Sequence, residues 1–133
     1  KNTVLDKVPF SLEKATSENW TAGIKQGGSG IEYSFSLKLG EINAITFDSV
    51  WVNSQRLYVK VVKEGKIVKD HSKLVSDDAI LIRCSGEQQA EGIIKSPQPL
   101  QENEALLRFI YNDDKMQFFK VTDIVITKSQ PRQ

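Results

Sequence analysis

The sequence predicts an all-β protein, an antiparallel two-sheet β-sandwich of immunoglobulin-like architecture with about eight strands. Three observations favour this fold class. Short alternations of apolar and polar residues recur along the 133 residues, turn-forming residues separate them, and no long segment has helical periodicity. Because short antiparallel strands bury their apolar faces by stacking two sheets, we expect a sandwich, with a flattened barrel as the alternative.

The clearest predicted strand follows a glycine-rich turn. Between Ile31 and Leu39 every second residue is apolar and the residues between them are polar, which is typical of a half-buried strand. The preceding run Gly27–Gly30 tolerates positive φ and has almost no side chains to pack. We therefore predict that this run reverses the chain after a strand at Trp20–Gln26.

The chain before that hairpin predicts a strand and a loop. Val8–Lys14 alternates apolar and polar residues. Pro9 places this first strand at the edge of a sheet, because proline lacks the N–H that a central strand donates. The polar segment Ala15–Asn19 is predicted to be a loop that leads to the strand at Trp20–Gln26.

The middle of the chain predicts a central strand and a hairpin. Within Ala44–Asn53 the apolar residues change parity, which indicates either a strand covered on both faces or a bulge near Asp48–Ser49. Arg56–Lys63 and Lys66–Lys69 then flank Glu64–Gly65, a pair that suits a tight hairpin turn.

Three further strands complete the predicted sheets, at Ala79–Ser85, Ala105–Asn112 and Lys115–Lys128. Cys84 lies in the first of them and is expected to pack as a small hydrophobic residue. The core candidates in the last two are Leu107, Phe109, Tyr111, Phe119 and Val121.

Length and composition fit one domain, which we place at residues 8–128, between a tether at 1–7 and a tail at 129–133. The 18 basic residues nearly balance the 17 acidic ones, the formal charge is +1, and like charges do not cluster, so we expect no nucleic-acid partner. A single cysteine excludes an internal disulfide, and no apolar run approaches the roughly 18 residues of a membrane span. Since the chain begins with Lys1, we expect that its start has been trimmed.

Three segments resemble a known group of proteins: W-T-A-G-I-K-Q-G-G-S-G-I from Trp20, F-D-S-V-W-V-N-S-Q-R-L from Phe47, and N-E-A-L-L-R-F-I-Y-N-D-D-K from Asn103. Their order is similar to that of small exported proteins of Bacteroidetes, often lipoproteins and mostly uncharacterised. The resemblance implies a periplasmic or outer-membrane location, a lost signal peptide, and membrane contact only through a lipid anchor that has been removed. It implies no activity. The run D-S-V is also similar to the O-glycosylation motif of that phylum, which requires Ser49 to face outward.

Few residues are suited to catalysis or metal binding. His71 is the only histidine and stands in a charged segment without the orienting partner that a catalytic base needs, so we interpret it as a solvated loop residue. One histidine and one cysteine do not make a zinc site. Asp77–Asp78 and Asp113–Asp114 could supply oxygen ligands to calcium, but paired aspartates are also common in turns. We expect no catalytic residue, no bound metal and no cofactor.

Aromatic residues are the best candidates for a binding site, because flat apolar rings with polar rims stack on sugars. Tyr58 lies on the polar parity of its strand beside Arg56 and should point outward, whereas Tyr33 lies on an apolar parity and is assigned to the core. Trp51 and Trp20 are the other large aromatic candidates. The predicted ligand-binding residues are therefore Tyr58, Trp51, Trp20 and Arg56.

Together these observations predict a non-catalytic module of the cell envelope that presents a surface to a protein or glycan partner, as a monomer or a weak dimer. Two alternatives stay open. One is a small hydrolase that gathers carboxylates from distant loops, which requires convergent polar groups in a concave site. The other is a barrel that holds a small apolar ligand in a cavity lined by Phe35, Phe47, Phe109 and Phe119, which a close-packed core would exclude.

Overall fold

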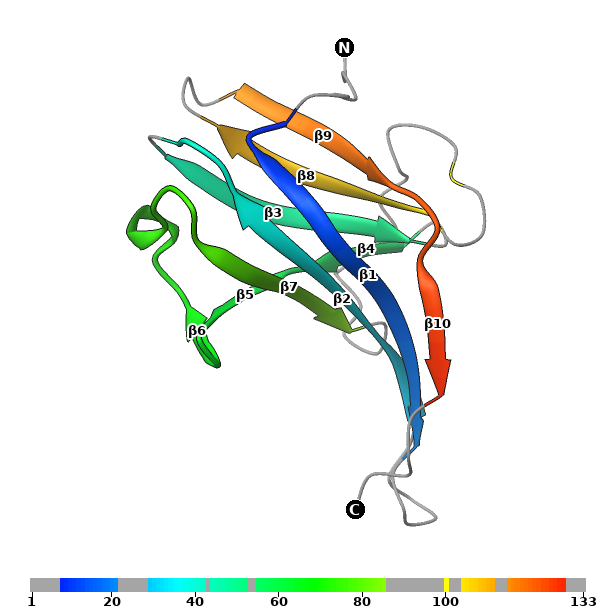
Figure 1. Ribbon diagram of the computed structural model, residues 1–133. Helices are drawn as coiled ribbons and strands as arrows, with labels where there is room; N and C mark the ends of the chain where they lie inside the picture. Colours follow the sequence, from blue (N-terminus) through cyan, green and yellow to red (C-terminus); the bar gives the residue numbers. More distant parts are fainter. Residues whose placement is uncertain are drawn as a thin grey trace.

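The chain forms the predicted sandwich of two sheets (Figure 1). The computed structural model describes residues 8–21, 29–42, 44–52, 55–85, 100, 104–111 and 115–128. Within these residues there are ten strands, one 3₁₀ turn and no α-helix, so none of them belongs to a helix that could span a membrane. In chain order the elements are β1 (Phe10–Thr21), β2 (Ser29–Leu39), β3 (Ile45–Val52), β4 (Gln55–Tyr58), β5 (Lys60–Lys63), β6 (Lys66–Val68), η1 (His71–Lys73), β7 (Ala79–Ser85), β8 (Ala105–Tyr111), β9 (Lys115–Val121) and β10 (Val125–Lys128).

The six-stranded sheet has the order β10-β1-β2-β7-β5-β6, and the four-stranded sheet has the order β4-β3-β8-β9. The chain crosses between the sheets four times, and two of these crossings divide strands that we had expected to be continuous. Arg56–Lys63 is divided at Val59, between β4 and β5, and Lys115–Lys128 is divided at residues 122–124, between β9 and β10. β10 lies parallel to β1, while the other neighbouring strands pair antiparallel (Figure 1).

The expected loop at Ala15–Asn19 is wrong, because β1 runs unbroken through it. From Thr16 to Asn19 this segment is paired on both sides, with β2 on one and β10 on the other. Ala15 and Ser17 face inward and are buried, and their small side chains let a polar stretch of sequence lie against the core. The polar residues that suggested a loop are divided between the two sides of a paired strand, with Ser17 on the inner side and Thr16 and Glu18 on the outer side.

A reversal near the glycine run is consistent with the strand pairing, but it falls earlier than the predicted Gly27–Gly30, because Ser29 and Gly30 already belong to β2 and pair with Thr21 and Trp20. Thr21 of β1 pairs antiparallel with Ser29 of β2, so the chain turns back between them, although residues 22–28 themselves lie outside the described part. The expected tether at 1–7 and tail at 129–133 also lie outside it. The first half of β1 lies at a sheet edge, as Pro9 predicted, since β10 pairs with β1 only from Thr16 onward.

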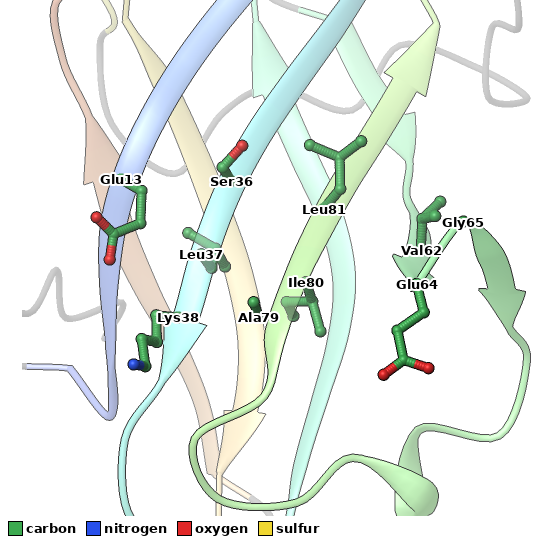
Figure 2. Close-up of a pocket in the computed structure, with 10 residues that line it drawn as sticks. All are labelled: Glu13, Ser36, Leu37, Lys38, Val62, Glu64, Gly65, Ala79, Ile80 and Leu81. Atoms are coloured by element: carbon green, nitrogen blue, oxygen red, sulfur yellow. The ribbon is translucent and has the colours of Figure 1, made fainter.

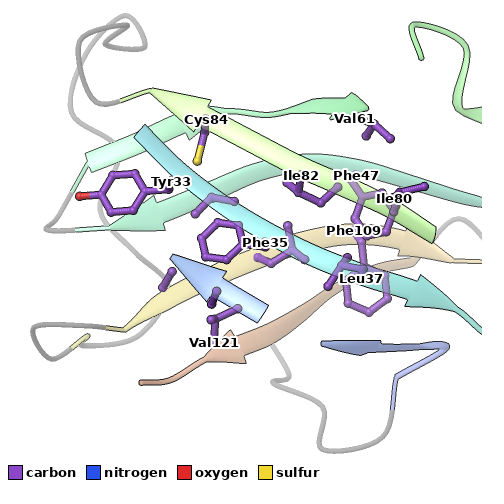
Figure 3. Packing of buried hydrophobic residues seen from close by; sticks show 14 of the residues in the cluster. Tyr33, Phe35, Leu37, Phe47, Val61, Ile80, Ile82, Cys84, Phe109 and Val121 are labelled. Atoms are coloured by element: carbon purple, nitrogen blue, oxygen red, sulfur yellow. The ribbon is translucent and has the colours of Figure 1, made fainter. Parts of the chain in front are cut away.

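The inner faces of the two sheets share one apolar core (Figure 3). Every second residue of β2 faces inward as predicted, and Phe35 is 0% exposed. Phe10 packs its ring on those of Phe47, Phe109 and Phe119, with centroid distances of 5.8, 5.2 and 5.4 Å. Three of the four aromatic rings proposed to line a barrel cavity therefore pack around Phe10 and fill the space between the sheets at this end of the core.

The predicted turn between β5 and β6 is confirmed. Glu64 and Gly65 have φ of 52° and 77°, the two consecutive positive values that a tight hairpin turn requires. A glycine is well suited to the second position because a Cβ is disfavoured there by the backbone conformation, even though no atom lies within 4 Å of where it would stand.

Candidate functional site

A β-bulge in β3 brings two polar side chains to the outer face of the four-stranded sheet. The register with β8 shifts between Phe47 and Ser49, so that Asp48 and Ser49 together stand opposite Arg108. Phe47 and Val50, on either side of this pair, are both buried in the core between the sheets. The change of parity in the sequence thus reflects a bulge, and the bulge turns two neighbouring polar residues toward one face.

Ser49 fixes Arg56 of β4. The Nε of Arg56 donates to the Oγ of Ser49 at 2.8 Å. Ser49 is 0% exposed, so this hydrogen bond satisfies a hydroxyl that would otherwise be buried without a partner. The burial also means that Ser49 is not accessible to a modifying enzyme in the folded chain, and the O-glycosylation suggested by its motif does not fit the structure.

One carboxylate, that of Asp48, stands between two guanidinium groups from the strands on either side of β3. The Nη2 of Arg108 contacts Oδ2 of Asp48, and the Nη2 of Arg56 lies 3.9 Å from its Oδ1. The two arginine side chains are each 17% exposed and Asp48 is 28% exposed. The Nε of Arg108 is buried and has no hydrogen-bond partner among the described residues. Two guanidinium groups against one carboxylate leave a formal charge of +1 at this point of the surface.

Trp51 forms an apolar base under these arginines. Its ring is only 2% exposed, so the expectation that it stacks directly on a ligand is wrong. Instead it packs with Leu106 and Phe118 in a second apolar cluster, on the side of the sheet away from the main core. The guanidinium carbons of Arg56 and Arg108 lie 5.8 and 5.2 Å from the centroid of the Trp51 ring, within the range of a cation–π interaction.

Tyr58 points outward as predicted, and its side chain is 57% exposed. The guanidinium carbon of Arg56 lies 5.3 Å from the centroid of the Tyr58 ring, so one arginine joins the exposed ring to the buried ring of Trp51. Trp20, the remaining predicted residue, belongs to β1 in the other sheet, and its side chain is not among those described. The structure therefore brings together three of the four predicted residues.

We call the group Asp48, Ser49, Trp51, Arg56, Tyr58 and Arg108 the outer-face site. Sequence reasoning did not assign Asp48 or Arg108 to it. A signal was present in β8, where Leu106 and Ile110 flank Arg108 on the parity opposite to the core residues. Apolar residues on both parities of a strand indicate that its outer face is also covered, and a charged residue among them has to find a partner there.

His71 is not the solvated loop residue that we expected. Its Nδ1 accepts the N–H of Phe47 at 3.2 Å and so ties η1 to β3 just ahead of the bulge. Burial lowers the pKa of His71, while the nearby carboxylate of Asp70 acts in the opposite direction. The hydroxyl of Ser72 donates to Asp70 at 2.6 Å rather than to the imidazole. His71 thus serves the backbone, and this adjacent serine is not activated by it.

The aspartates proposed for calcium have other partners where the structure describes them. The carboxylate of Asp78 accepts the N–H of Val75 at 2.9 Å and the ammonium of Lys63 at 3.0 Å. Burial alone would raise the pKa of Asp78, but these two donors lower it. Asp77 adopts a φ of 68°, as a turn residue, and Asp113–Asp114 lies outside the described residues. No cluster of three metal-ligating side chains occurs in the described part of the chain.

Cys84 packs in the core as predicted. Burial, together with the charge of Glu32, raises the pKa of its thiol to about 12. A thiol that stays protonated and buried at neutral pH is not a nucleophile.

The outer face of the six-stranded sheet carries a shallow, open depression of about 500 Å³ (Figure 2). Leu81 and Val62 supply part of its apolar surface, and Glu13 and Glu64 lie on opposite sides of it (Figure 2). A glycoside hydrolase needs two carboxylates that converge on one bond, and these two do not converge. This depression therefore does not favour the hydrolase alternative.

Comparison of the chain with protein-family models, with curated proteins and with solved structures finds no match. The function of the outer-face site therefore has to be inferred from its own geometry and chemistry.

Proposed function

We propose that the protein is a non-catalytic binding module of the bacterial envelope and that it holds a glycan on the outer-face site. The observation that carries this proposal is the exposed ring of Tyr58 beside the fixed guanidinium of Arg56. A sugar is bound well by a flat aromatic face next to hydrogen-bonding groups, because its C–H faces stack on the ring while its hydroxyls need polar partners.

The rigidity of the site supports a binding role. Arg56 is held by Ser49 below it and lies over the buried Trp51, and the strands carrying these residues belong to one sheet. A ligand that meets side chains already held in place loses less conformational entropy on binding. A tyrosine adds a large contact area with few rotatable bonds.

A glycan is favoured over a protein partner by the distribution of exposed apolar residues. Ile67, Val75, Met116 and Val125 are each more than half exposed, but Ile67 and Val125 belong to the other sheet and Val75 to the segment before β7, so that only Met116 shares the four-stranded sheet with Tyr58. Single exposed apolar residues are normal on a protein surface, whereas a protein interface usually gathers them in one patch. The outer-face site instead combines one exposed ring with charged groups.

The envelope location is supported by the resemblance of the sequence to exported proteins of Bacteroidetes, and the proposal includes a monomer or a weak dimer in solution. A non-catalytic role is supported by the geometry around His71, whose Nδ1 is taken by the backbone of Phe47, and around Asp48, which is paired with two arginines. Neither group stands ready to transfer a proton to a substrate.

A glycan-array screen tests the proposal. The wild-type protein is expected to bind at least one glycan class, and Tyr58→Ala is expected to weaken that binding about tenfold, the effect of losing one stacking contact. Ile67→Ala is the matched control, since Ile67 is 56% exposed and lies on the other sheet. Absence of binding to all glycans, or an equal loss in both variants, would refute the proposed function.

A further inference from the structure

We infer that the outer-face site selects glycans that carry an anionic group, a carboxylate or a sulfate, and that Arg56 and Arg108 recognise this group. The inference rests on the proposed function and names the class of glycan. Its basis is the unequal number of charges in the site, where two guanidinium groups share the carboxylate of Asp48.

The charge balance extends to the neighbouring strands. The other charged pair described on this part of the sheet joins Lys120 of β9 to Glu104. The Nζ of Lys120 lies 3.3 Å from the Oε1 of Glu104, and the two charges cancel. The excess positive charge therefore stays at Arg56 and Arg108. An anion bound beside Arg56 and Arg108 would supply the second negative charge that Asp48 alone does not provide.

The two arginines also have unused donors. Arg56 gives its Nε to Ser49, and its closest approach to Asp48 is 3.9 Å, which is beyond a hydrogen bond. Arg108 contacts Asp48 through Nη2, and its Nε is buried, so only its terminal nitrogens can meet a ligand from solvent. A guanidinium group carries more N–H donors than these contacts use, and its planar fork matches the two oxygens of a carboxylate or sulfate.

The position of the arginines suits a ligand that arrives from solvent. Both side chains keep 17% of their surface exposed, although Trp51 beneath them is almost fully buried. Tyr58, more than half exposed, lies beside Arg56. A sugar ring stacked on Tyr58 would thus carry its acidic substituent toward the guanidinium groups, so that ring and charge are recognised together.

The charge of the whole chain argues against a general affinity for polyanions. The formal net charge is only +1, and like charges do not cluster in the sequence. Binding of an anion should therefore depend on the site and on the sugar ring, and a polyanion without sugar rings should bind poorly.

The experiment measures the affinity of the full chain for matched pairs of glycans by titration calorimetry. Polygalacturonate is compared with its methyl-esterified form, which lacks the free carboxylates, and carrageenan, a sulfated galactan, is compared with its desulfated form, which is neutral. Poly-glutamate serves as an anionic polymer without sugar. The variants are Arg56→Gln and Arg108→Gln, with Lys66→Gln as a control that removes an exposed positive charge on β6, in the other sheet.

We expect at least one acidic glycan to bind about tenfold more tightly than its neutral partner, the effect of one charge-assisted hydrogen bond. Arg56→Gln and Arg108→Gln should abolish this preference, while Lys66→Gln keeps it. Which pair shows the preference distinguishes carboxylate from sulfate. If Arg108→Gln does not fold, judged by its circular dichroism, Arg56→Gln alone decides.

Equal affinity for acidic and neutral glycans would overturn this inference and leave the proposed function standing. Poly-glutamate bound as tightly as the acidic glycans would also overturn it, since the sugar would then contribute nothing. No binding of any glycan would overturn the proposed function itself, and the inference with it.

Discussion

The outer faces of the two sheets are built differently, although both look away from the shared core. The outer face of the four-stranded sheet carries its own buried apolar cluster of Trp51, Leu106 and Phe118, topped by arginines that share one carboxylate. On the six-stranded sheet, the arginine of the described charge pair Arg83–Glu32 is more exposed, at 43% against 17%, while Glu32 at 20% is about as exposed as Asp48. On the outer side of this sheet, Leu81 and Val62 line an open depression and are only partly buried (Figure 2).

The two outer faces differ in how much the position of each charged side chain matters for stability. Charged side chains that lie on an apolar cluster lose hydration, and this cost is offset only when each charge has an opposite charge and hydrogen-bond partners close to it. Surface pairs such as Arg83–Glu32 contribute little and need no such base. We therefore expect substitutions on the outer face of the four-stranded sheet to lower the free energy of unfolding more than comparable substitutions on the other outer face.

The largest effect should follow removal of the apolar base. Trp51→Ala is expected to lower the free energy of unfolding by about 3–5 kcal/mol, the range for truncating a buried large aromatic residue. Leu81→Ala, at a partly buried position on the other outer face, should cost about 1 kcal/mol or less. Urea unfolding followed by fluorescence of the remaining tryptophan, and by circular dichroism, measures both. Similar losses in the two variants would show that the outer faces do not differ.

The second effect concerns the shared carboxylate. Asp48→Asn should lower the free energy of unfolding by about 1.5–3 kcal/mol, because two partly buried guanidinium groups lose their counter-charge. Glu32→Gln removes the corresponding charge from the pair with Arg83 and should cost less than about 1 kcal/mol. The difference should persist in high salt, since partly buried pairs are screened less. A larger loss for Glu32→Gln would contradict this reading.

The third effect is the replacement of a guanidinium by an ammonium. Arg56→Lys keeps the charge but cannot make the Nε bond to Ser49 or lie flat on the rings of Trp51 and Tyr58, so we expect a loss of about 1 kcal/mol. Arg83→Lys should change stability by less than about 0.5 kcal/mol. Chemical denaturation of the two variants side by side gives the comparison, and an unchanged Arg56→Lys would mean that the guanidinium geometry is unimportant.

The smallest effect is a pH dependence at the bulge. Because burial lowers the pKa of His71 in the folded chain from its ordinary value of 6.5, the unfolded chain takes up the proton first as the pH falls. The stability from neutral His71 is therefore complete above pH 6.5 and declines below it, as protonation removes the acceptor for the N–H of Phe47. His71→Gln should flatten the stability curve in this range. The lowered pKa values of Asp70 and Asp78 act only near or below their ordinary value of 3.8, so they do not obscure it.

Most of the sandwich was predictable because alternation of polarity is a local property. Phe35, Ile82 and Cys84 are buried as their parity predicted, and Tyr58 points outward for the same reason. The turn at Glu64–Gly65 was also predictable, because its residues accept positive φ. The bulge at Asp48–Ser49 was indicated as one of two possibilities by a break in the alternation of apolar and polar residues. In each case neighbouring residues along the chain carry the information.

Only the tertiary structure decided what the polar stretches do. Ala15–Asn19 reads as a loop, yet it is a strand because β2 and β10 supply partners on both sides. His71 reads as solvated, yet it is held by the backbone of a strand 24 residues away in the sequence. Polar side chains take their role from whichever partner the fold brings to them, and the sequence around them does not contain that partner.

The same limit applies to the outer-face site. The sequence determined that Tyr58 and Arg56 share one face of a strand, because side chains alternate along β structure. It did not determine that Asp48 and Arg108, on two other strands, would meet them, or that Trp51 would be covered rather than exposed. Those contacts depend on the order and register of β4, β3 and β8 in the sheet, which are set by packing between segments far apart in the chain.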